Sequence, residues 1–352
     1  MTPPVRPLRQ GPRPLTFHLS AALAAWPGSK LALPPSRSGS LPWNPALAAR
    51  AAELGPLLAA ADPTALADAV DREARRRLDR FLTGVARYRA HPYRRTLPTP
   101  PAVWQEGTAR LLDFGGAPGA LPLLLVPSLV NRGYILDLAP GRSFARWLSA
   151  RGVRPLLLDW ERPGSVERRF TLTDYVAGRL SRALDAAAEA AGGPVAVAGY
   201  CMGGLLATAL AGLRPERVAA LVLMATPWDF HAGDPEGARR TAATLPLVEP
   251  MLGLLGEMPT DTIQALFAML DPVLALRKFS RFAELDPDGE EARSFVALED
   301  WLNDGVPLAA PVARETLGGW YGLNQPARGD WLVGGLPVDP ARLDLPVLAL
   351  VP

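Results

Sequence analysis

The chain has 352 residues, of which 49% are hydrophobic and 20% are charged, and its formal net charge is +2. These fractions exclude a disordered chain, and so balanced a charge gives no reason to expect a nucleic acid as partner. A single cysteine, Cys201, excludes an intrachain disulfide and zinc sites with two or more thiolates, while three histidines (His18, His91 and His231) leave little for a metal centre.

The N-terminal quarter of the chain divides into two regions. Residues 1–44 are rich in proline, arginine and serine and have weak periodicity, which predicts an extended or poorly ordered arm. Residues 45–98 are predicted to be a helical region. Within it, Asp62 is a helix start signal, and apolar residues over 77–89 recur at the i, i+3, i+4, i+7 spacing of an amphipathic helix.

Residues 99–232 have the pattern of an α/β core. Short continuous apolar runs alternate with helical segments, which is typical of a mostly parallel sheet with buried faces. The uncharged stretch 190–213 is long enough to span a membrane, but its glycines and Pro194 favour a buried strand, a turn and a helix. Strands are expected at 102–107, 109–114, 121–126, 154–158, 194–198 and 218–224, and helices at 142–150, 173–190 and 203–213.

Residues 233–342 interrupt this alternation with helical segments and loops. We interpret them as a cap inserted into the α/β core, and residues 343–352 as a strand that resumes the sheet. The cap is rich in aromatic side chains, which we expect to form its core and, secondarily, to line a channel: Phe267, Phe279, Phe282, Phe295, Trp301, Trp320, Tyr321 and Trp331.

The segment Gly199–Gly204 fits the pattern G-x-nucleophile-x-G between a strand and a helix, with Cys201 in the nucleophile position. Gly199 and Gly203 remove side chains that would clash with neighbouring elements in so sharp a turn. The N-terminus of the following helix carries partial positive charge and free N–H groups, which favour the thiolate. The alternative, a small buried hydrophobic residue, is the usual role of a lone cysteine, but the complete strand–turn–helix context favours the nucleophile.

When the nucleophile attacks a carbonyl, the carbonyl oxygen becomes negatively charged and needs hydrogen-bond donors to stabilise it. The backbone N–H of Met202 follows the nucleophile directly and is predicted to be the first donor. The second donor in such a fold comes from the loop after the third strand, here residues 127–134. Either Val130 or Asn131 is the candidate.

These residues resemble the polyhydroxyalkanoate synthases, polymerases of the α/β-hydrolase fold. The resemblance covers residues from about 98 to 352, whereas residues 1–97 match only as a variable helical region. The cysteine-type elbow at Gly199–Gly204 together with Thr226–Phe230 on the following strand is fairly specific, because most α/β hydrolases carry serine. The other matching segments are Leu129–Arg132 with Tyr134, Leu158–Trp160, Leu172–Tyr175, Glu299–Trp301 and Tyr321–Asn324.

The resemblance implies an acyltransferase that polymerises (R)-3-hydroxyacyl-CoA through an acyl-cysteine intermediate. Cys201 would attack the thioester and release coenzyme A, a histidine would accept the thiol proton, and an aspartate would assist the hydroxyl that attacks next. It implies no cofactor besides the coenzyme A thioester used as substrate, and no nucleic acid or transmembrane segment. It further implies a homodimer or a second synthase subunit, and a cytoplasmic location at the surface of polyester granules.

The sequence departs from the family pattern at its C-terminal end. The family aspartate lies just after the strand that matches Leu345–Leu350, and the histidine lies further along, so both are absent from this chain. We therefore expect a fragment that lacks the last strand, a helix and the histidine loop of the fold. Such a chain would be inactive or impaired, and the flank of its last strand would be exposed.

Residues present in this chain could replace the missing aspartate and histidine only if their side chains had the geometry of a catalytic triad. Asp229 and His231 follow the fourth parallel strand, and we expect Asp229 to brace its loop and His231 to be solvated. His18 and His91 are expected to be ordinary surface residues, and Asp159 to brace the sheet edge. Two other functions remain open: a cysteine-dependent esterase or thioesterase on the same fold, and a non-catalytic protein that binds a granule or a partner.

Overall fold

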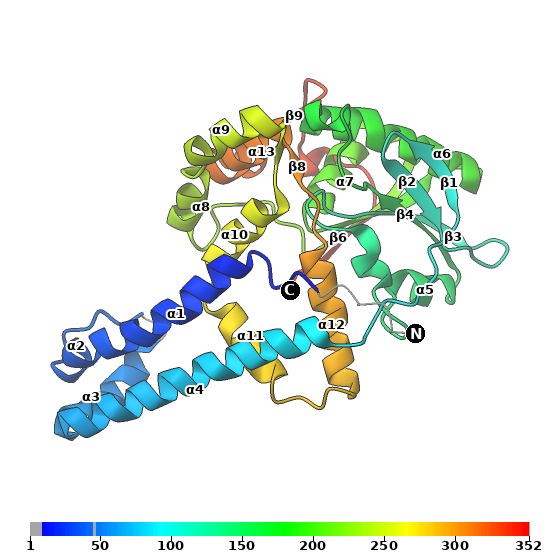
Figure 1. Ribbon diagram of the computed structural model, residues 1–352. Coiled ribbons are helices and arrows are strands. Elements are labelled where there is room, and N and C mark those ends of the chain that lie inside the picture. Colours follow the sequence, from blue (N-terminus) through cyan, green and yellow to red (C-terminus); the bar gives the residue numbers. More distant parts are fainter. Residues whose placement is uncertain (1–8, 45–46, 352) are drawn as a thin grey trace. The chain divides into compact units, whose positions relative to one another are not determined.

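The computed structural model describes residues 9–44 and 47–351 (Figure 1). The described residues fall into two compact units. Those within Met1–Tyr93 and Phe267–Glu299 form the helical unit, and those within Arg94–Leu266 and Asp300–Pro352 form the sheet unit. The chain passes from one unit to the other within α10 (Thr260–Leu270) and α12 (Glu290–Asn303).

The helical unit is built around aromatic side chains of α4 and α11. Phe81 and Tyr88 of α4 make edge-on ring contacts with Phe279 of α11, with ring centroids 6.3 and 5.6 Å apart. Phe282 is also buried in this cluster. The helices that lie wholly in this unit are α1 (Leu15–Leu31), α2 (Leu33–Arg37), α3 (Ala48–Ala60), α4 (Pro63–Ala90) and α11 (Leu274–Phe282).

The prediction of an extended or poorly ordered arm over residues 1–44 is wrong for α1 and α2; residues 1–8 lie outside the described part of the chain. The reason is tertiary. Helix α1 packs along α4, where Ala22 is buried in the aromatic cluster and the indole N–H of Trp26 donates to Asp71 Oδ1 at 2.8 Å. These contacts stabilise a helix whose own sequence has almost no amphipathic stripe.

The sheet unit contains a seven-stranded sheet with the order β1-β2-β4-β3-β5-β6-β11. Strands β1 and β2 form an antiparallel hairpin, and β2 is antiparallel to β4. All other neighbours are parallel. The strands are β1 (Ala102–Glu106), β2 (Ala109–Asp113), β3 (Leu121–Val126), β4 (Val153–Asp159), β5 (Val195–Tyr200), β6 (Val218–Met224) and β11 (Val347–Leu350), so every strand predicted from the apolar runs is present.

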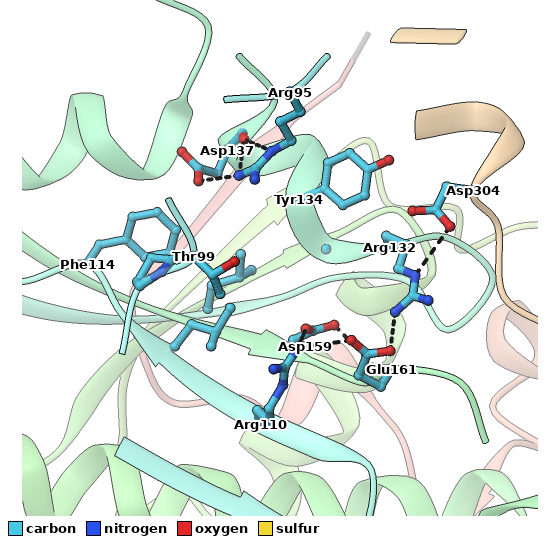
Figure 2. A pocket seen from close by; sticks show the side chains of 14 residues that line it. Arg95, Thr99, Arg110, Phe114, Arg132, Tyr134, Asp137, Asp159, Glu161 and Asp304 are labelled. Atoms are coloured by element: carbon cyan, nitrogen blue, oxygen red, sulfur yellow. Dashed lines mark hydrogen bonds and ion pairs between the residues drawn. The ribbon is translucent and has the colours of Figure 1, made fainter. Parts of the chain in front are cut away.

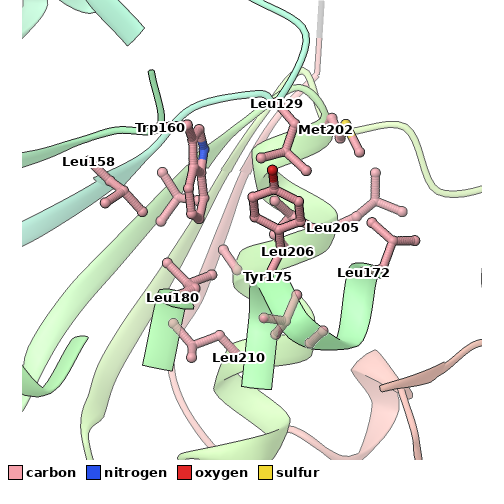
Figure 3. Close-up of a cluster of buried hydrophobic side chains, with 14 of the residues drawn as sticks. Leu129, Leu158, Trp160, Leu172, Tyr175, Leu180, Met202, Leu205, Leu206 and Leu210 are labelled. Carbon is pink, nitrogen blue, oxygen red and sulfur yellow. The ribbon is translucent and has the colours of Figure 1, made fainter. Parts of the chain in front are cut away.

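Both faces of the central strands are buried, because neighbouring side chains of a strand point to opposite faces. Leu124 and Leu156 belong to the cluster that packs under α7 (Met202–Leu213), whose interior is drawn in Figure 3. Leu125 and Leu157 belong to the cluster on the opposite face. The first face also carries the π-helix η4 (Asp174–Leu180) and α6 (Ser181–Ala191), and the second carries η2 (Gly133–Asp137) and α5 (Phe144–Ser149).

The segment predicted as one inserted cap is divided between the units. Residues 267–299 join the helical unit, because Phe279, Phe282 and Phe295 pack against one another and, with α4, form its core. The remaining elements of the segment and its flanks are α8 (Pro235–Ala242), α9 (Leu245–Leu255), β7 (Glu257–Met258), β8 (Leu308–Ala309), α13 (Ala310–Arg314), η5 (Glu315–Gly322), α14 (Gln325–Arg328), β9 (Leu332–Val333), β10 (Leu336–Pro337) and η6 (Pro340–Arg342), with η3 (Glu167–Arg169) earlier in the chain.

Strand β11 forms one edge of the sheet and pairs in parallel with β6. Val347, Leu348 and Leu350 are each about half exposed, at 50, 55 and 51%. The expectation of an exposed apolar flank agrees with these exposed fractions. Among the described residues, no helix has both the length and the apolarity that a membrane crossing requires.

Candidate active site

Cys201 occupies a sharp turn between β5 and α7. Its backbone angles, φ 53° and ψ −125°, lie in a region that residues other than glycine rarely adopt. The turn is held by two backbone bonds: Cys201 N–H donates to Met224 O of β6, and Gly204 N–H donates to Cys201 O, both at 2.9 Å. Strain of this kind persists only where the surroundings enforce it, and it places a side chain at the carboxyl edge of the sheet.

The two predicted glycines make this turn sterically feasible. A Cβ on Gly199 would lie 2.4 Å from Gly204 Cα, and a Cβ on Gly203 would lie 2.1 Å from Val126 O, the last carbonyl of β3. Helix α7 therefore starts in direct contact with the end of β3. Because β3 and β5 are parallel neighbours, the loop after β3 lies beside the nucleophile turn, where such sheets bind their ligands.

The Cys201 side chain is partly buried, and burial raises the pKa of its thiol above the usual value. The backbone N–H of Met202, the first residue of α7, lowers this pKa but offsets only part of the rise. The prediction that the helix N-terminus favours the thiolate is therefore outweighed by desolvation. Met202 is the first residue of α7 and directly follows the nucleophile, and its N–H stays the predicted first oxyanion donor.

We expect alkylation of Cys201 by iodoacetamide to accelerate about tenfold per pH unit through the neutral range, because only the thiolate reacts and its fraction is small. The raised pKa predicts no plateau up to about pH 9. Intact-protein mass spectrometry measures the rate, and every adduct on a thiol reports Cys201, the single cysteine. A small free thiol in the same buffers serves as control. A rate that levels off below about pH 8 would contradict the raised pKa.

The loop after β3 is held in place by hydrogen bonds on both sides. Val130 N–H donates to Ser128 Oγ at 3.3 Å, and Val130 O accepts from Val306 N–H at 3.2 Å. The predicted second donor at Val130 is thus engaged within its own loop and stays a prediction. The backbone N–H of Asn131, the other candidate, likewise stays a prediction; its side-chain amide nitrogen is buried and makes no hydrogen bond with the described residues.

A chain of alternating charges anchors the same loop to the end of β4, a feature that sequence reasoning missed (Figure 2). Arg110 Nη2 donates to Asp159 at 2.7 Å and to Glu161 at 2.9 Å, so Asp159 braces the sheet edge as expected. Glu161 also pairs with Arg132, whose Nε lies 3.7 Å from Asp304 Oδ1. The only signal of this network in the sequence was the presence of opposite charges at the end of β4 and in the loop after β3.

These charges line a cavity of about 290 Å³. Its arginines are already paired with carboxylates, including Arg95 with Asp137 at 2.7 Å, so the cavity offers no surplus positive charge for a phosphate. The indole N–H of Trp301 donates to Arg132 O at 2.7 Å and secures the backbone of the loop. We infer a structural role for this network in holding the loop that carries Val130.

The loop after β6 carries Asp229 and His231. Asp229 Oδ1 accepts the backbone N–H of His231 at 2.9 Å, so this carboxylate braces its own loop as predicted. His231 is not freely solvated, because its Nε2 lies 2.9 Å from Tyr321 O and must donate to that carbonyl. A histidine oriented in this way retains only Nδ1 for proton transfer.

His18 and His91 lie in the helical unit, and the prediction that they are ordinary surface residues is wrong. His91 is 6% exposed and its Nε2 lies 2.8 Å from Pro287 O. Burial lowers the pKa of His18, with Arg13 O as its backbone partner. Both rings are covered because the N-terminal helices pack on α11 and its flanks, which the sequence did not reveal.

Comparisons with known proteins agree with this fold. A family model described as alpha/beta hydrolase fold matches residues 122–242. "Poly(3-hydroxyalkanoate) polymerase subunit PhaC" of Allochromatium vinosum is 32% identical over 256 residues, which cover 70% of this chain and 71% of that protein. The Synechocystis protein of the same name is 31% identical over 258 residues, covering 71% of this chain and 68% of that protein.

The protein of that name from Haloferax mediterranei is also 31% identical, over 256 residues. The match covers 71% of this chain but 52% of the Haloferax protein, so this chain spans about half the length of that relative. The match to the other two relatives extends over at least two thirds of their length. The chain therefore belongs to the poly(3-hydroxyalkanoate) polymerase PhaC family, with the α/β-hydrolase fold.

Proposed function

We propose that this protein transfers the acyl group of a (R)-3-hydroxyacyl-CoA to Cys201, as the covalent step of polyester synthesis. The observation that carries the proposal is the strained conformation of Cys201 at the β5–α7 turn, in a chain of this family. The Cys201 sulfur would attack the thioester carbonyl, the bond from that carbon to the coenzyme A sulfur would break, and the released thiolate would take up the proton lost by Cys201.

Two features of the site support this step and one slows it. Met202 directly follows Cys201 at the start of α7, where its N–H would stabilise the oxyanion, and the anchored loop at Val130 follows β3, the parallel neighbour of β5. Against this, within the described residues no histidine hydrogen-bonds to the Cys201 sulfur, whose pKa is raised by burial. We therefore propose that the chain by itself acylates slowly, since loss of triad partners costs several powers of ten in rate.

The proposal extends to location and partners. An enzyme that builds an insoluble polyester works at the growing granule, so we place the protein in the cytoplasm at that surface. A homodimer or a second synthase subunit would then complete the active enzyme.

We expect incubation with 3-hydroxybutyryl-CoA to add the mass of a hydroxybutyryl group to the protein and to release free coenzyme A. The C201A variant should show neither, because no other thiol is present. Intact-protein mass spectrometry and a thiol assay measure both products. Raising the pH should speed the step as the thiolate fraction grows.

The fate of the acyl group separates the alternatives. Insoluble polymer supports the synthase. Free 3-hydroxybutyrate without polymer would replace it by a cysteine-dependent hydrolase. A wild-type chain that binds granules but is never acylated, with C201A behaving identically, would leave only a non-catalytic binding function.

A further inference from the structure

Besides the His231 bond to Tyr321 O, a buried side-chain amide joins the loop after β6 to the chain segment that follows η5. Asn324 is 8% exposed, and its Oδ1 accepts the backbone N–H of Phe230 at 3.0 Å. Its Nδ2 donates to Asp229 Oδ1 at 2.7 Å. Both ends of the amide are thus used by consecutive residues of one loop, although 94 residues separate Asn324 from Phe230 in the sequence.

The chemistry of this contact suits asparagine. Its backbone is left-handed, with φ 53° and ψ 40°, a conformation that asparagine adopts more readily than most residues. The amide presents one acceptor and one donor in a plane, which matches a backbone N–H beside a carboxylate. The Asn324 hydrogen bond is also the main cause that lowers the pKa of Asp229, so Asp229 is ionised at neutral pH.

The loop after β6, η5 and the segment that follows η5 carry an aromatic cluster, here called the aromatic wall: Trp228, Phe230, Trp320, Tyr321 and Trp331. The Phe230 ring lies 4.9 Å from the Tyr321 ring and 5.6 Å from the Trp320 ring, between centroids. Trp331 contacts both Trp320, at 5.2 Å, and Trp228, at 6.4 Å. The packing of these rings therefore depends on how the loop after β6 is aligned with η5 and the segment that follows it.

The loop that carries part of the aromatic wall begins beside the nucleophile turn. Cys201 N–H donates to Met224 O at the end of β6, and a Cβ on Gly204 would lie 1.8 Å from Thr226 Oγ1 in this loop. Burial and, after it, the negative charge of Cys201 raise the pKa of Tyr321. Phe230 packs on this same ring. A shift of the loop after β6 would consequently move the surface that an acyl group or reagent meets on its way to Cys201.

We propose that Asn324 is a positioning residue: its amide fastens the loop after β6 to the segment after η5 and so sets the aromatic wall beside Cys201. The wall then limits the size of group that reaches the sulfur. This inference rests on Cys201 being the reactive group, as in the proposed function, but it does not require acyl transfer to occur.

The test compares two maleimides that react with the thiolate in the same way, N-phenylmaleimide and the smaller N-methylmaleimide. The ratio of the N-phenylmaleimide rate to the N-methylmaleimide rate on Cys201 does not depend on the thiolate fraction. It reports only how easily the larger reagent reaches the sulfur. N324D keeps the shape of the side chain but places a second carboxylate against Asp229. At pH 7.5 we expect the ratio to rise about tenfold, because a hydrogen bond to a charged group is replaced by repulsion.

At pH 5 the two carboxyl groups of N324D share a proton, which restores a donor, and we expect the ratio to return to the wild-type value. N324G keeps the left-handed backbone without a side chain, and its ratio should be high at both pH values. Circular dichroism checks that each variant is folded.

Two results would overturn the proposal: a folded N324D with the wild-type ratio at pH 7.5, or a raised ratio that pH 5 does not reverse. Should N324D not fold, N324G decides the question, because a folded N324G with the wild-type ratio would overturn the proposal as well. Because the maleimides need no thioester, absence of acylation by hydroxybutyryl-CoA would refute the proposed function and leave this test standing.

Discussion

Replacing Gly203 by alanine is expected to destabilise the sheet unit by about 3 kcal/mol or more and to abolish the reactive turn at Cys201. The new Cβ would lie 2.1 Å from Val126 O and 2.8 Å from the carbonyl carbon of Pro127. These are backbone atoms at the end of the central strand β3, which is hydrogen-bonded on both sides and cannot withdraw. Relief of the clash would require α7 to move away from the sheet.

Urea unfolding measures the loss of stability, and the rate of Cys201 alkylation reports the turn. The matched control is G193A in the turn before β5, where a Cβ would meet nothing within 4 Å and the backbone is not left-handed. Its free energy of unfolding should stay within about 0.5 kcal/mol of the wild type. Equal stability of G203A and G193A would contradict the close approach of α7 to β3.

The second large effect is expected at Gly84, where α4 crosses α11 in the helical unit. A Cβ on Gly84 would lie 1.9 Å from the backbone oxygen of Phe279 and 2.7 Å from its carbonyl carbon. G84A should therefore separate the two helices and open the aromatic cluster at Phe81 and Tyr88. We expect a cost of at least about 3 kcal/mol, since overpacking against backbone cannot be relieved by a side-chain rotation.

Hydrogen exchange resolved by mass spectrometry localises this effect, with faster exchange expected in α4 and α11 and little change in β3 and β5. The control is G28A, inside α1, where a Cβ would meet nothing within 4 Å. That substitution should raise stability by up to about 1 kcal/mol, because alanine is the better helix former. If G84A behaved like G28A, the tight crossing of α4 and α11 would be wrong.

The features that the sequence predicted wrongly are those that depend on packing between distant segments of the chain. The prolines and weak periodicity of residues 1–44 concealed α1, because a helix stabilised by packing on α4 needs little amphipathic pattern of its own. The cap was predicted as one body, yet Phe279 and Phe282 complete the core of the helical unit. Likewise, the helix N-terminus at Cys201 predicted a low pKa, while burial of the thiol outweighs it.

The sequence by itself determined the parallel core and the nucleophile turn. Buried parallel strands appear in the sequence as continuous apolar runs. The turn at Cys201 needs glycine at positions 199 and 203, because any Cβ there would clash with neighbouring backbone. Only the tertiary structure decided the contacts between distant segments. These are the ion pair of Arg132 with Glu161, the hydrogen bond of His91 with Pro287 O, and the hydrogen bonds of Asn324 with Asp229 and Phe230. Such contacts depend on where the chain returns in space, a property that no local pattern of residues encodes.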